Sequence, residues 1–216
     1  MQVYNSFGPN PRALRMFLAE KGLSIPMKDV DLMAAENRRP PYTDRNPGGQ
    51  LPALELDNGK TIGETVAIFE YLEEKHPKPA LVGTTPEERA ETRQWQRRVE
   101  LNITENVYNG FRYGEGFEIF KNRMLVFPES SASLKKLAQN RMEWLDGLVA
   151  GRDWIVPNRF TIADIILYCC LDFSSGVGQT IPSSAKNLQG WFKRVSERPS
   201  AAASLHPGSA KLKMRG

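Results

Sequence analysis

Residues 48–65 read GGQLPALELDNGKTIGET, and this stretch decides the fold. Two short β-prone runs, 54–57 and 60–62, flank Asn58-Gly59, the strongest local signature of a two-residue β-hairpin. Pro52 precedes the first run, at a strand entrance where a missing N–H removes no ladder hydrogen bond. The stretch therefore predicts a hairpin that the chain enters through a proline.

The residues on either side of the hairpin could meet a ligand. A cis peptide bond between Leu51 and Pro52 would turn the Leu51 backbone outward, where its N–H and C=O could pair with an extended ligand. Glu64-Thr65 begins the next helix, whose free N–H groups and positive end attract a carboxylate. A capping role for Thr65 and a favourable first-turn charge for Glu64 explain the same residues. Both interpretations stay open on the sequence alone.

The segments around the hairpin complete a small α/β unit. Val3-Tyr4 begins a short strand, and residues 27–32 alternate in polarity as a second strand does. Between them we expect a helix over 11–21 with Asn10 as its N-cap. A further helix is expected over 64–75. A right-handed crossover makes the first two strands parallel, so the order β-α-β-β-β-α predicts a four-stranded mixed sheet.

The remainder of the chain is predicted to be helical. Thr85-Pro86-Glu87-Glu88 and Thr161-Ile162-Ala163-Asp164 each have the pattern of a capped helix start. Other helices are expected from Ser131 or Ser133 and around residues 188–195. The longest apolar stripe steps by four residues through Trp95, Val99, Ile103, Val107 and Phe111. We therefore predict an α/β domain over 1–79 and an all-helical domain over 86–216.

Composition and charge narrow the class of protein. The chain has 216 residues, of which 40% are hydrophobic and 25% charged, which excludes a fibrous or disordered chain. No run approaches about 18 apolar residues, and the first residues lack a signal-peptide pattern, so we expect a cytoplasmic protein without a membrane span. The net charge is +4, and the basic residues that cause it are interspersed with acidic residues. This distribution favours a small anionic ligand over a nucleic acid.

The residues suited to metal binding are few. Cys169 and Cys170 adjoin each other, and His76 and His206 are the only histidines. These four residues are too few and too scattered for a zinc-type cluster, so we expect no metal site.

Taken together, these features resemble the cytosolic glutathione transferase superfamily over nearly the whole chain. The similar motifs are Pro11 to Gly22 in the first helix, Asn46 to Pro52 in a cis-proline loop, Phe160 to Asp164 in a capping box, and Trp191 to Ser200 at the end. The start Gly8-Pro9-Asn10-Pro11 is most similar to a fungal and bacterial theta-like subgroup. The resemblance implies a thioredoxin-like first domain, a helical second domain and a homodimer.

The resemblance also implies a ligand and its contacts. Glutathione would be the co-substrate, with its cysteinyl part paired to the Leu51 backbone beside cis-Pro52. Glu64 and Thr65 would hold the γ-glutamyl ammonium and carboxylate, and Gln50 would add an amide contact. A hydrophobic electrophile would lie between the domains. The residues expected against it are Phe7, Tyr108, Phe111 and Phe117.

The sequence departs from its relatives at the group that stabilises the glutathione thiolate. The serine of theta-like relatives corresponds to Gly8, and the cysteine of other relatives has no counterpart in this domain. Tyr4 corresponds to the tyrosine of a third set of relatives, although an aromatic residue in a short strand equally suits a core. The other candidates are the N-terminus of the first helix and the side chains of Ser6, Asn10, Arg112 and Tyr113. Arg112 and Tyr113 end the long helix and face either the pocket or solvent.

Two other functions remain open on the sequence. Folds of this family also serve as non-catalytic binding or assembly modules, a role consistent with Gly8 in the serine position. A glutathione-dependent disulfide or peroxide reductase is the third possibility, although no cysteine lies near the expected site.

Overall fold

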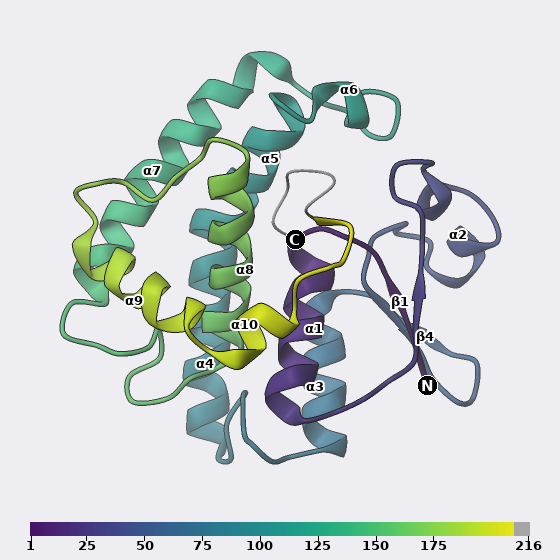
Figure 1. Ribbon diagram of the computed structural model, residues 1–216, viewed down its shortest axis with the longest axis horizontal. Coiled ribbons are helices and arrows are strands. Elements are labelled where there is room, and N and C mark those ends of the chain that lie inside the picture. Colours follow the sequence, from purple (N-terminus) through teal and green to yellow (C-terminus); the bar gives the residue numbers. More distant parts are fainter. Residues whose placement is uncertain (210–216) are drawn as a thin grey trace.

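The first part of the chain is a four-stranded sheet with helices on both faces (Figure 1). The computed structural model describes residues 1–209. The elements of this part are β1 (Gln2–Asn5), α1 (Pro9–Lys21), β2 (Met27–Asp29), η1 (Glu36–Arg38), α2 (Tyr42–Arg45), β3 (Ala53–Glu55), β4 (Thr61–Ile62) and α3 (Thr65–Lys75). The predicted thioredoxin-like order of elements is therefore confirmed.

The sheet has the mixed topology that the sequence predicts. The strand order is β2-β1-β3-β4, with β1 and β2 parallel and the other two pairs antiparallel. Val3 pairs with Leu54 across β1 and β3, and both lie in the main core. There Phe17 of α1 stacks on Phe69 of α3, with ring centroids 4.5 Å apart. One face of the sheet is thus buried against α1 and α3.

The opposite face carries a smaller apolar cluster. Tyr4, Val30, Tyr42 and Ala53 pack together there, and the rings of Tyr4 and Tyr42 meet edge to face at 5.6 Å. Because successive side chains of a strand point to opposite faces, Val3 enters the main core and Tyr4 enters this cluster. Tyr4 is therefore a packed residue of the α2 side of the sheet.

Several boundaries differ from the prediction. The hairpin strands are shorter than the runs 54–57 and 60–62, and α3 begins one residue after Glu64. The second strand ends at Asp29, three residues earlier than expected. The first helix begins at Pro9 with Gly8 as its N-cap, so the assignment of Asn10 as N-cap is wrong. Gly8 has φ 123° and ψ 162°, a conformation that glycine adopts readily, and it allows the turn into the helix one residue before the first proline. Asn10 is consequently the second residue of the helix.

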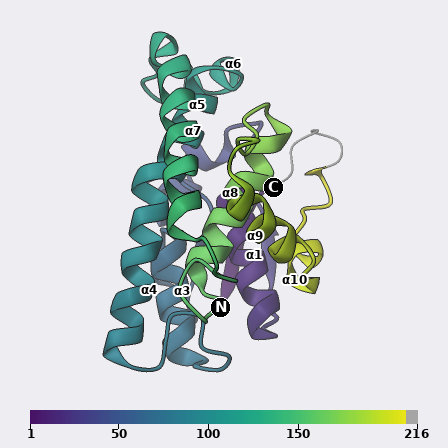
Figure 2. The same ribbon diagram turned by 90° about the vertical axis from the view of Figure 1, so that its left-hand side faces the viewer.

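The second part of the chain is helical, as predicted. Its elements are α4 (Pro86–Val99), the π-helical segment η2 (Glu100–Thr104), α5 (Glu105–Tyr113), α6 (Phe117–Phe120), η3 (Pro128–Ser130), α7 (Ser131–Leu148), α8 (Ile162–Gly176), α9 (Lys186–Ser196) and α10 (Pro199–Ala203). Helix α8 packs against both α1 and α4, and Figure 2 shows it between the tall α4–α5–α7 layer and α1. Within residues 1–209, no helix combines the length and apolar character needed to cross a bilayer.

The four-residue spacing of the long apolar stripe has a structural cause. An ideal α-helix has 3.6 residues per turn, so a stripe with steps of four would drift around the axis. The π-helical turn at 100–104 between α4 and α5 offsets part of this drift because it is wider. Trp95, Val99, Ile103, Val107 and Phe111 are all buried as a result.

The connection between the two parts is anchored by a buried carboxylate. Oε1 of Glu73 accepts hydrogen bonds from the backbone N–H groups of Leu81 and Val82, both at 2.9 Å. Lys21 of α1 forms an ion pair with the same carboxylate. These contacts fix the chain between α3 and α4, and the domain limits at residues 79 and 86 remain our proposal.

A capping box begins the most buried helix, α8. The Asp164 carboxylate accepts hydrogen bonds from the backbone N–H of Thr161 and Ile155, both at 2.9 Å, and from the Trp191 indole at 2.8 Å. The Thr161 hydroxyl accepts from the Ala163 N–H at 3.3 Å. Asp164 therefore connects the start of α8 to α9 and to the chain that precedes α8.

We predict that Asp164→Ala lowers the free energy of unfolding by about 3 kcal/mol, because it leaves several buried donors without an acceptor. Urea unfolding followed by circular dichroism measures this change. The matched control is Asp153→Ala, because Asp153 is exposed and lies 3.5 Å from Arg194 at the surface. We expect the control to change the free energy by less than about 0.5 kcal/mol. Equal stability of the two variants would contradict the anchoring role of Asp164.

Candidate functional site

Two cavities meet where α1 begins. The first, here called the apolar cleft, contains about 910 Å³ of space that is partly open to solvent. The second, here called the acidic cavity, contains about 900 Å³ by the same measure. Asn10 and Tyr108 line both of them, and the Tyr108 hydroxyl donates to Asn10 Oδ1 at 3.3 Å. A molecule longer than one cavity could therefore pass Asn10 and occupy both.

The apolar cleft lies between the two domains. Its apolar lining includes Phe7, Leu32 and Leu51 of the first domain and Phe111, Phe120 and Phe173 of the second. The predicted positions of Phe7, Tyr108 and Phe111 against this cleft agree with the structure. Phe117 is not part of the lining, and the neighbouring residues Ile119 and Phe120 line the cleft instead. Such a lining suits an apolar ligand.

The acidic cavity begins at the N-terminus of α3. Glu64 is the N-cap of this helix and has φ 63°, in the left-handed region that a non-glycine residue rarely adopts. Thr65 is the first residue of the helix, so its N–H has no partner within the helix. Glu64 and Thr65 line the cavity together with Glu100 and Glu105. The cavity thus presents carboxylates to a cation and a helix N-terminus to an anion.

The cis-proline loop forms the wall of the apolar cleft. The Leu51–Pro52 peptide bond is cis, as the resemblance implies. The Tyr42 hydroxyl and Asn46 Nδ2 donate to the Gln50 carbonyl at 2.5 and 2.8 Å, which fixes the loop. Gln50 and Leu51 line the cleft, and no hydrogen bond within residues 1–209 uses the Leu51 N–H or C=O. The Leu51 backbone is therefore available to an extended ligand, and Pro52 itself is buried.

The N-terminus of α1 offers fewer free donors than an ordinary helix. The first four N–H groups of a helix normally lack partners, but Pro9 and Pro11 have no N–H at all. The N–H of Arg12 donates to the Gly8 carbonyl at 3.1 Å. The backbone donors that remain are the N–H groups of Gly8 and Asn10. The N-terminus of α1 thus remains a candidate with two backbone donors, and the side-chain amide of Asn10 is a third donor beside them.

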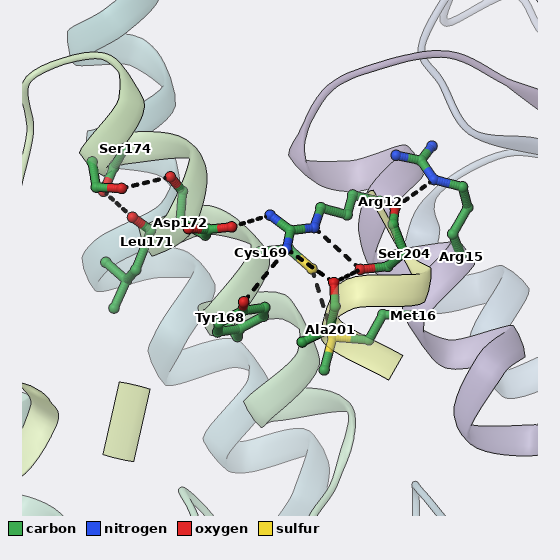
Figure 3. A network of polar contacts seen from close by, with 11 residues as sticks. Arg12, Arg15, Met16, Tyr168, Cys169, Leu171, Asp172, Ser174, Ala201 and Ser204 are labelled. Atoms are coloured by element: carbon green, nitrogen blue, oxygen red, sulfur yellow. Dashed lines mark hydrogen bonds and ion pairs between the residues drawn. The ribbon is translucent and has the colours of Figure 1, made fainter. Parts of the chain in front are cut away.

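Two buried arginines hold this part of α1 in place, as Figure 3 shows. Arg12 forms an ion pair with Asp172 of α8, and its guanidinium also donates to the Ala201 carbonyl of α10 at 3.3 Å. Arg15 donates to the Ser6 carbonyl at 2.8 Å and to the Ser204 carbonyl at 2.7 Å. Burial lowers the pKa of Arg15 to about 10, so its guanidinium stays charged at neutral pH. The loop between β1 and α1 is thereby tied to the C-terminal part of the fold.

Two of the predicted catalytic residues have other partners. The Tyr4 hydroxyl donates to Glu55 Oε2 at 2.6 Å, and the Ser6 hydroxyl donates to the Val30 carbonyl at 2.9 Å. Both side chains are buried, and neither lines the cleft or the acidic cavity. Burial, followed by the hydrogen bond and charge of Glu55, raises the pKa of Tyr4. Tyr4 and Ser6 therefore lie outside both cavities.

The second domain supplies two candidates for stabilising the thiolate, Arg112 and Tyr113 at the end of α5, and they have different surroundings. Arg112 lines the apolar cleft, with Cζ 5.8 Å from the Tyr108 ring centroid and 5.9 Å from that of Phe120. Tyr113 does not line it and meets Phe127 edge to face at 5.9 Å. Arg112 thus faces the pocket, and Tyr113 belongs to a separate aromatic contact.

The two cysteines lie in the core of α8. Both side chains are fully buried, and burial is the main cause that raises the pKa of Cys169 to about 12 and the pKa of Cys170 as well. Neither lines the cleft or the acidic cavity. Both thiols therefore stay protonated and lie outside the two cavities.

Five charged residues of the two cavities are not predicted from the sequence. Arg38 and Arg123 line the cleft, and Arg97, Glu100 and Glu105 line the acidic cavity. Arg123 lies in the loop after α6, and Arg38 is the last residue of the 3₁₀-helix η1. No local pattern marks these positions. The π-helical turn, which brings Glu100 and Glu105 to one side, is also not evident from the sequence.

Comparisons with known proteins agree with this geometry. Residues 1–74 match the glutathione S-transferase N-terminal domain and residues 127–199 match the C-terminal domain of the same family. Glutathione S-transferase 2 of Saccharomyces cerevisiae is 30% identical over 93% of this chain and 87% of its own. The crystal structure of Gtt2 from Saccharomyces cerevisiae superimposes with a TM-score of 0.88 at 29% identity, over 95% of this chain and 100% of that one.

A bacterial structure is similarly close. The glutathione S-transferase domain-containing protein of Marinobacter aquaeolei VT8 has a TM-score of 0.86 and 33% identity, over 93% of this chain and 99% of that one. Family domains, sequence similarity and fold thus point to the same assignment across nearly the whole chain. The chain belongs to the glutathione S-transferase family.

Proposed function

We propose that this chain is a glutathione transferase, which holds the glutathione thiolate at the start of α1 for attack on a hydrophobic electrophile in the apolar cleft. The observation that carries this proposal is the meeting of two unlike cavities at Asn10. One cavity is lined by carboxylates and a helix N-terminus, and the other by aromatic rings and arginines. Glutathione has an amino-acid group at one end and a carboxylate at the other, with the thiol between them.

The γ-glutamyl end of glutathione suits the acidic cavity. Its ammonium group would pair with Glu64, and its carboxylate would accept hydrogen bonds from the Thr65 N–H and hydroxyl at the start of α3. Glu105 lines the same cavity and adds negative charge around the ammonium, whereas Glu100 is paired with Arg97. The unusual φ of Glu64 supports a functional role, because strained backbone is often retained where a ligand binds.

The middle of glutathione suits the cis-proline loop. The Leu51 N–H and C=O would pair with the cysteinyl backbone as an added strand does, and Gln50 would contact the adjoining amide. The glycyl carboxylate would then lie on the cleft side, where Arg38 is the first-domain cation. The glutathione ammonium and glycyl carboxylate would thus each meet a group of opposite charge, and the γ-glutamyl carboxylate would meet hydrogen-bond donors.

The thiol would lie against Gly8 and Asn10. A free thiol has a pKa of about 8.5, so a site that favours the thiolate speeds attack at neutral pH. The Gly8 and Asn10 N–H groups can donate to sulfur, and the partial positive charge of α1 acts in the same direction. Asn10 Oδ1 accepts from Tyr108, which leaves its side-chain amide free to donate as well. Burial raises the pKa of Tyr108 well above its usual value, so it remains a donor.

The two alternative functions have less support in the geometry. A reductase that works through a cysteine would need a thiol at the site, and neither Cys169 nor Cys170 lines either cavity. A non-catalytic module would need no thiolate-stabilising group. The free donors at Gly8 and Asn10 favour an enzyme over such a module.

Turnover and binding together test the proposed function. We expect the purified protein to be retained on immobilised glutathione and to form a thioether from glutathione and 1-chloro-2,4-dinitrobenzene. Glu64→Gln should weaken glutathione binding by about 10-fold, because it removes the charge opposite the ammonium. Glu74→Gln is the matched control on the exposed side of the same helix and should bind as the native chain does. Retention without thioether formation would indicate a carrier, and absence of both would indicate a scaffold.

Titration of the bound thiol tests its donors. Asn10→Ala should raise the pKa of bound glutathione by about half a unit to one unit, because it removes a hydrogen bond to the thiolate. Tyr4→Phe should leave that pKa unchanged, since the Tyr4 hydroxyl is bonded to Glu55. The ultraviolet absorbance of the thiolate against pH measures both. If the pKa of the bound thiol rises in Tyr4→Phe but not in Asn10→Ala, the hydrogen bond to the thiolate comes from Tyr4 and not from Asn10.

The homodimer is a prediction that rests on the resemblance to the family. We expect the protein in solution to have twice the mass of one chain when it is measured by light scattering during size-exclusion chromatography. A mass of one chain at every concentration would contradict this expectation.

A further inference from the structure

The apolar cleft has an unusual distribution of charge. Three guanidinium groups line it, those of Arg38, Arg112 and Arg123, and its lining contains no aspartate or glutamate. Within residues 1–209, none of the three forms an ion pair with a carboxylate, whereas most ion pairs of the chain join an arginine to a nearby acid. The cleft therefore concentrates positive charge on an otherwise apolar wall.

The three arginines differ in what occupies their N–H groups. Arg123 donates to the carbonyls of Leu32 at 2.6 Å and Met33 at 2.9 Å, so it connects the second domain to the loop after β2. Arg38 makes one long hydrogen bond, to the Gly48 carbonyl at 3.4 Å, and its buried Nε has no partner. Burial and then the charges of Arg112 and Arg123 lower the pKa of Arg38, which places the three guanidiniums within each other's field.

Arg112 is the cation best placed for a ligand of the second domain. Its Nη1 donates to Asn109 Oδ1 at 3.0 Å, and its guanidinium lies near the rings of Tyr108 and Phe120. These contacts hold the side chain in the cleft while its other N–H groups have no partner within residues 1–209. An aromatic ligand against Phe111 and Phe120 would bring a substituent within reach of this guanidinium.

Glutathione does not account for all of this charge. If its γ-glutamyl end lies at Glu64 and Thr65, only its glycyl carboxylate reaches the cleft, and one carboxylate neutralises one guanidinium. Arg38, in the first domain beside Gln50, is available for that group. Arg112 then remains without a counter-ion in a half-buried, apolar setting where a charge-assisted hydrogen bond is strong.

We propose that the second substrate of this chain is an apolar, aromatic electrophile that carries an acidic group, and that Arg112 binds this group. This inference rests on the proposed function and names its substrate class. In the reaction, the glutathione sulfur forms a C–S bond at the electrophilic carbon and the leaving group departs with its bonding pair as an anion. The thiol proton passes to solvent. Arg112 orients the ring and takes no part in the bond changes.

Two matched electrophiles test the inference. 4-Chloro-3-nitrobenzoate and 4-chloro-3-nitrobenzamide share the ring and the chloride leaving group, and they differ in charge at one substituent. Each kcat/KM is divided by the rate constant of the uncatalysed reaction with glutathione, which removes the difference in intrinsic reactivity. We expect this normalised value to favour the benzoate by about 10-fold or more, consistent with a charge-assisted hydrogen bond.

Variants then assign the preference to one residue. Arg112→Gln should lower the benzoate-to-benzamide ratio by about 10-fold. Arg39→Gln is the matched control, because Arg39 is an exposed arginine next to Arg38 that does not line the cleft, and it should leave the ratio unchanged. Arg38→Gln should instead raise the KM for glutathione with both electrophiles. Equal normalised rates for the two electrophiles, or an unchanged ratio in Arg112→Gln, would overturn the inference.

Failure of the proposed function gives a different result. If neither electrophile forms a thioether, the transferase proposal fails, and calorimetric binding of the benzoate and the benzamide to the glutathione-loaded protein decides the inference about Arg112. Tighter binding of the benzoate that is lost in Arg112→Gln would support an anion site in a binding module. Equal binding of the two compounds would overturn that site too.

Discussion

The buried ion pair between Arg12 and Asp172 is the contact on which the site depends. It joins the first helix of the α/β domain to the central helix of the helical domain, and the Arg12 side chain is fully buried. Loss of either partner would leave an uncompensated charge in the core, which is far more costly than loss of an exposed pair. Because α1 begins at the junction of the two cavities, this contact sets where Gly8 and Asn10 lie relative to Tyr108 and Phe173.

The distribution of charged residues in the site is complementary to a ligand that carries charged groups at both ends. Acidic residues gather around the start of α3, and arginines gather around the cleft, with α1 between the two groups. Neither set is neutralised within its own cavity, except that Arg97 pairs with Glu100 at 2.9 Å. A site with unpaired charged groups binds most favourably a ligand that carries the opposite charge at each end. Complementarity of this kind orients the ligand as well as binding it.

Much of the fold could be predicted from the sequence because its signals are local. The Asn58-Gly59 turn, the proline before β3 and the Thr161–Asp164 capping box each depend on residues adjacent in the chain. The errors have equally local causes. Asn10 is a good N-cap by type, but the φ of Gly8 allows the helix to begin earlier. Strand β2 ends at Asp29, where the chain leaves the sheet for the loop that Arg123 later contacts.

The site was harder to predict because it is assembled from distant segments. Leu51, Glu64 and Thr65 were recognised through short motifs, and the structure places all three at the cavities. Tyr4 could not be assigned from the sequence, because the face on which a strand residue lies depends on the strand pairing and not on its type. The partner that occupies its hydroxyl, Glu55, lies 51 residues away. Arg38 ends η1 in the first domain and Arg123 follows α6 in the second, so only the packed structure brings them to one cleft.

The π-helical turn at 100–104 sets the rotational phase of everything that follows it in the long helix. Each residue of an α-helix advances the chain by about 100° around the axis, and a residue of the wider π-turn advances it by less. A deletion inside the turn that restores a regular α-helix would therefore leave the direction of Tyr108, Phe111 and Arg112 nearly unchanged. A deletion in the regular part of α4 would instead rotate these side chains by about 100° away from the cleft relative to the upstream stripe.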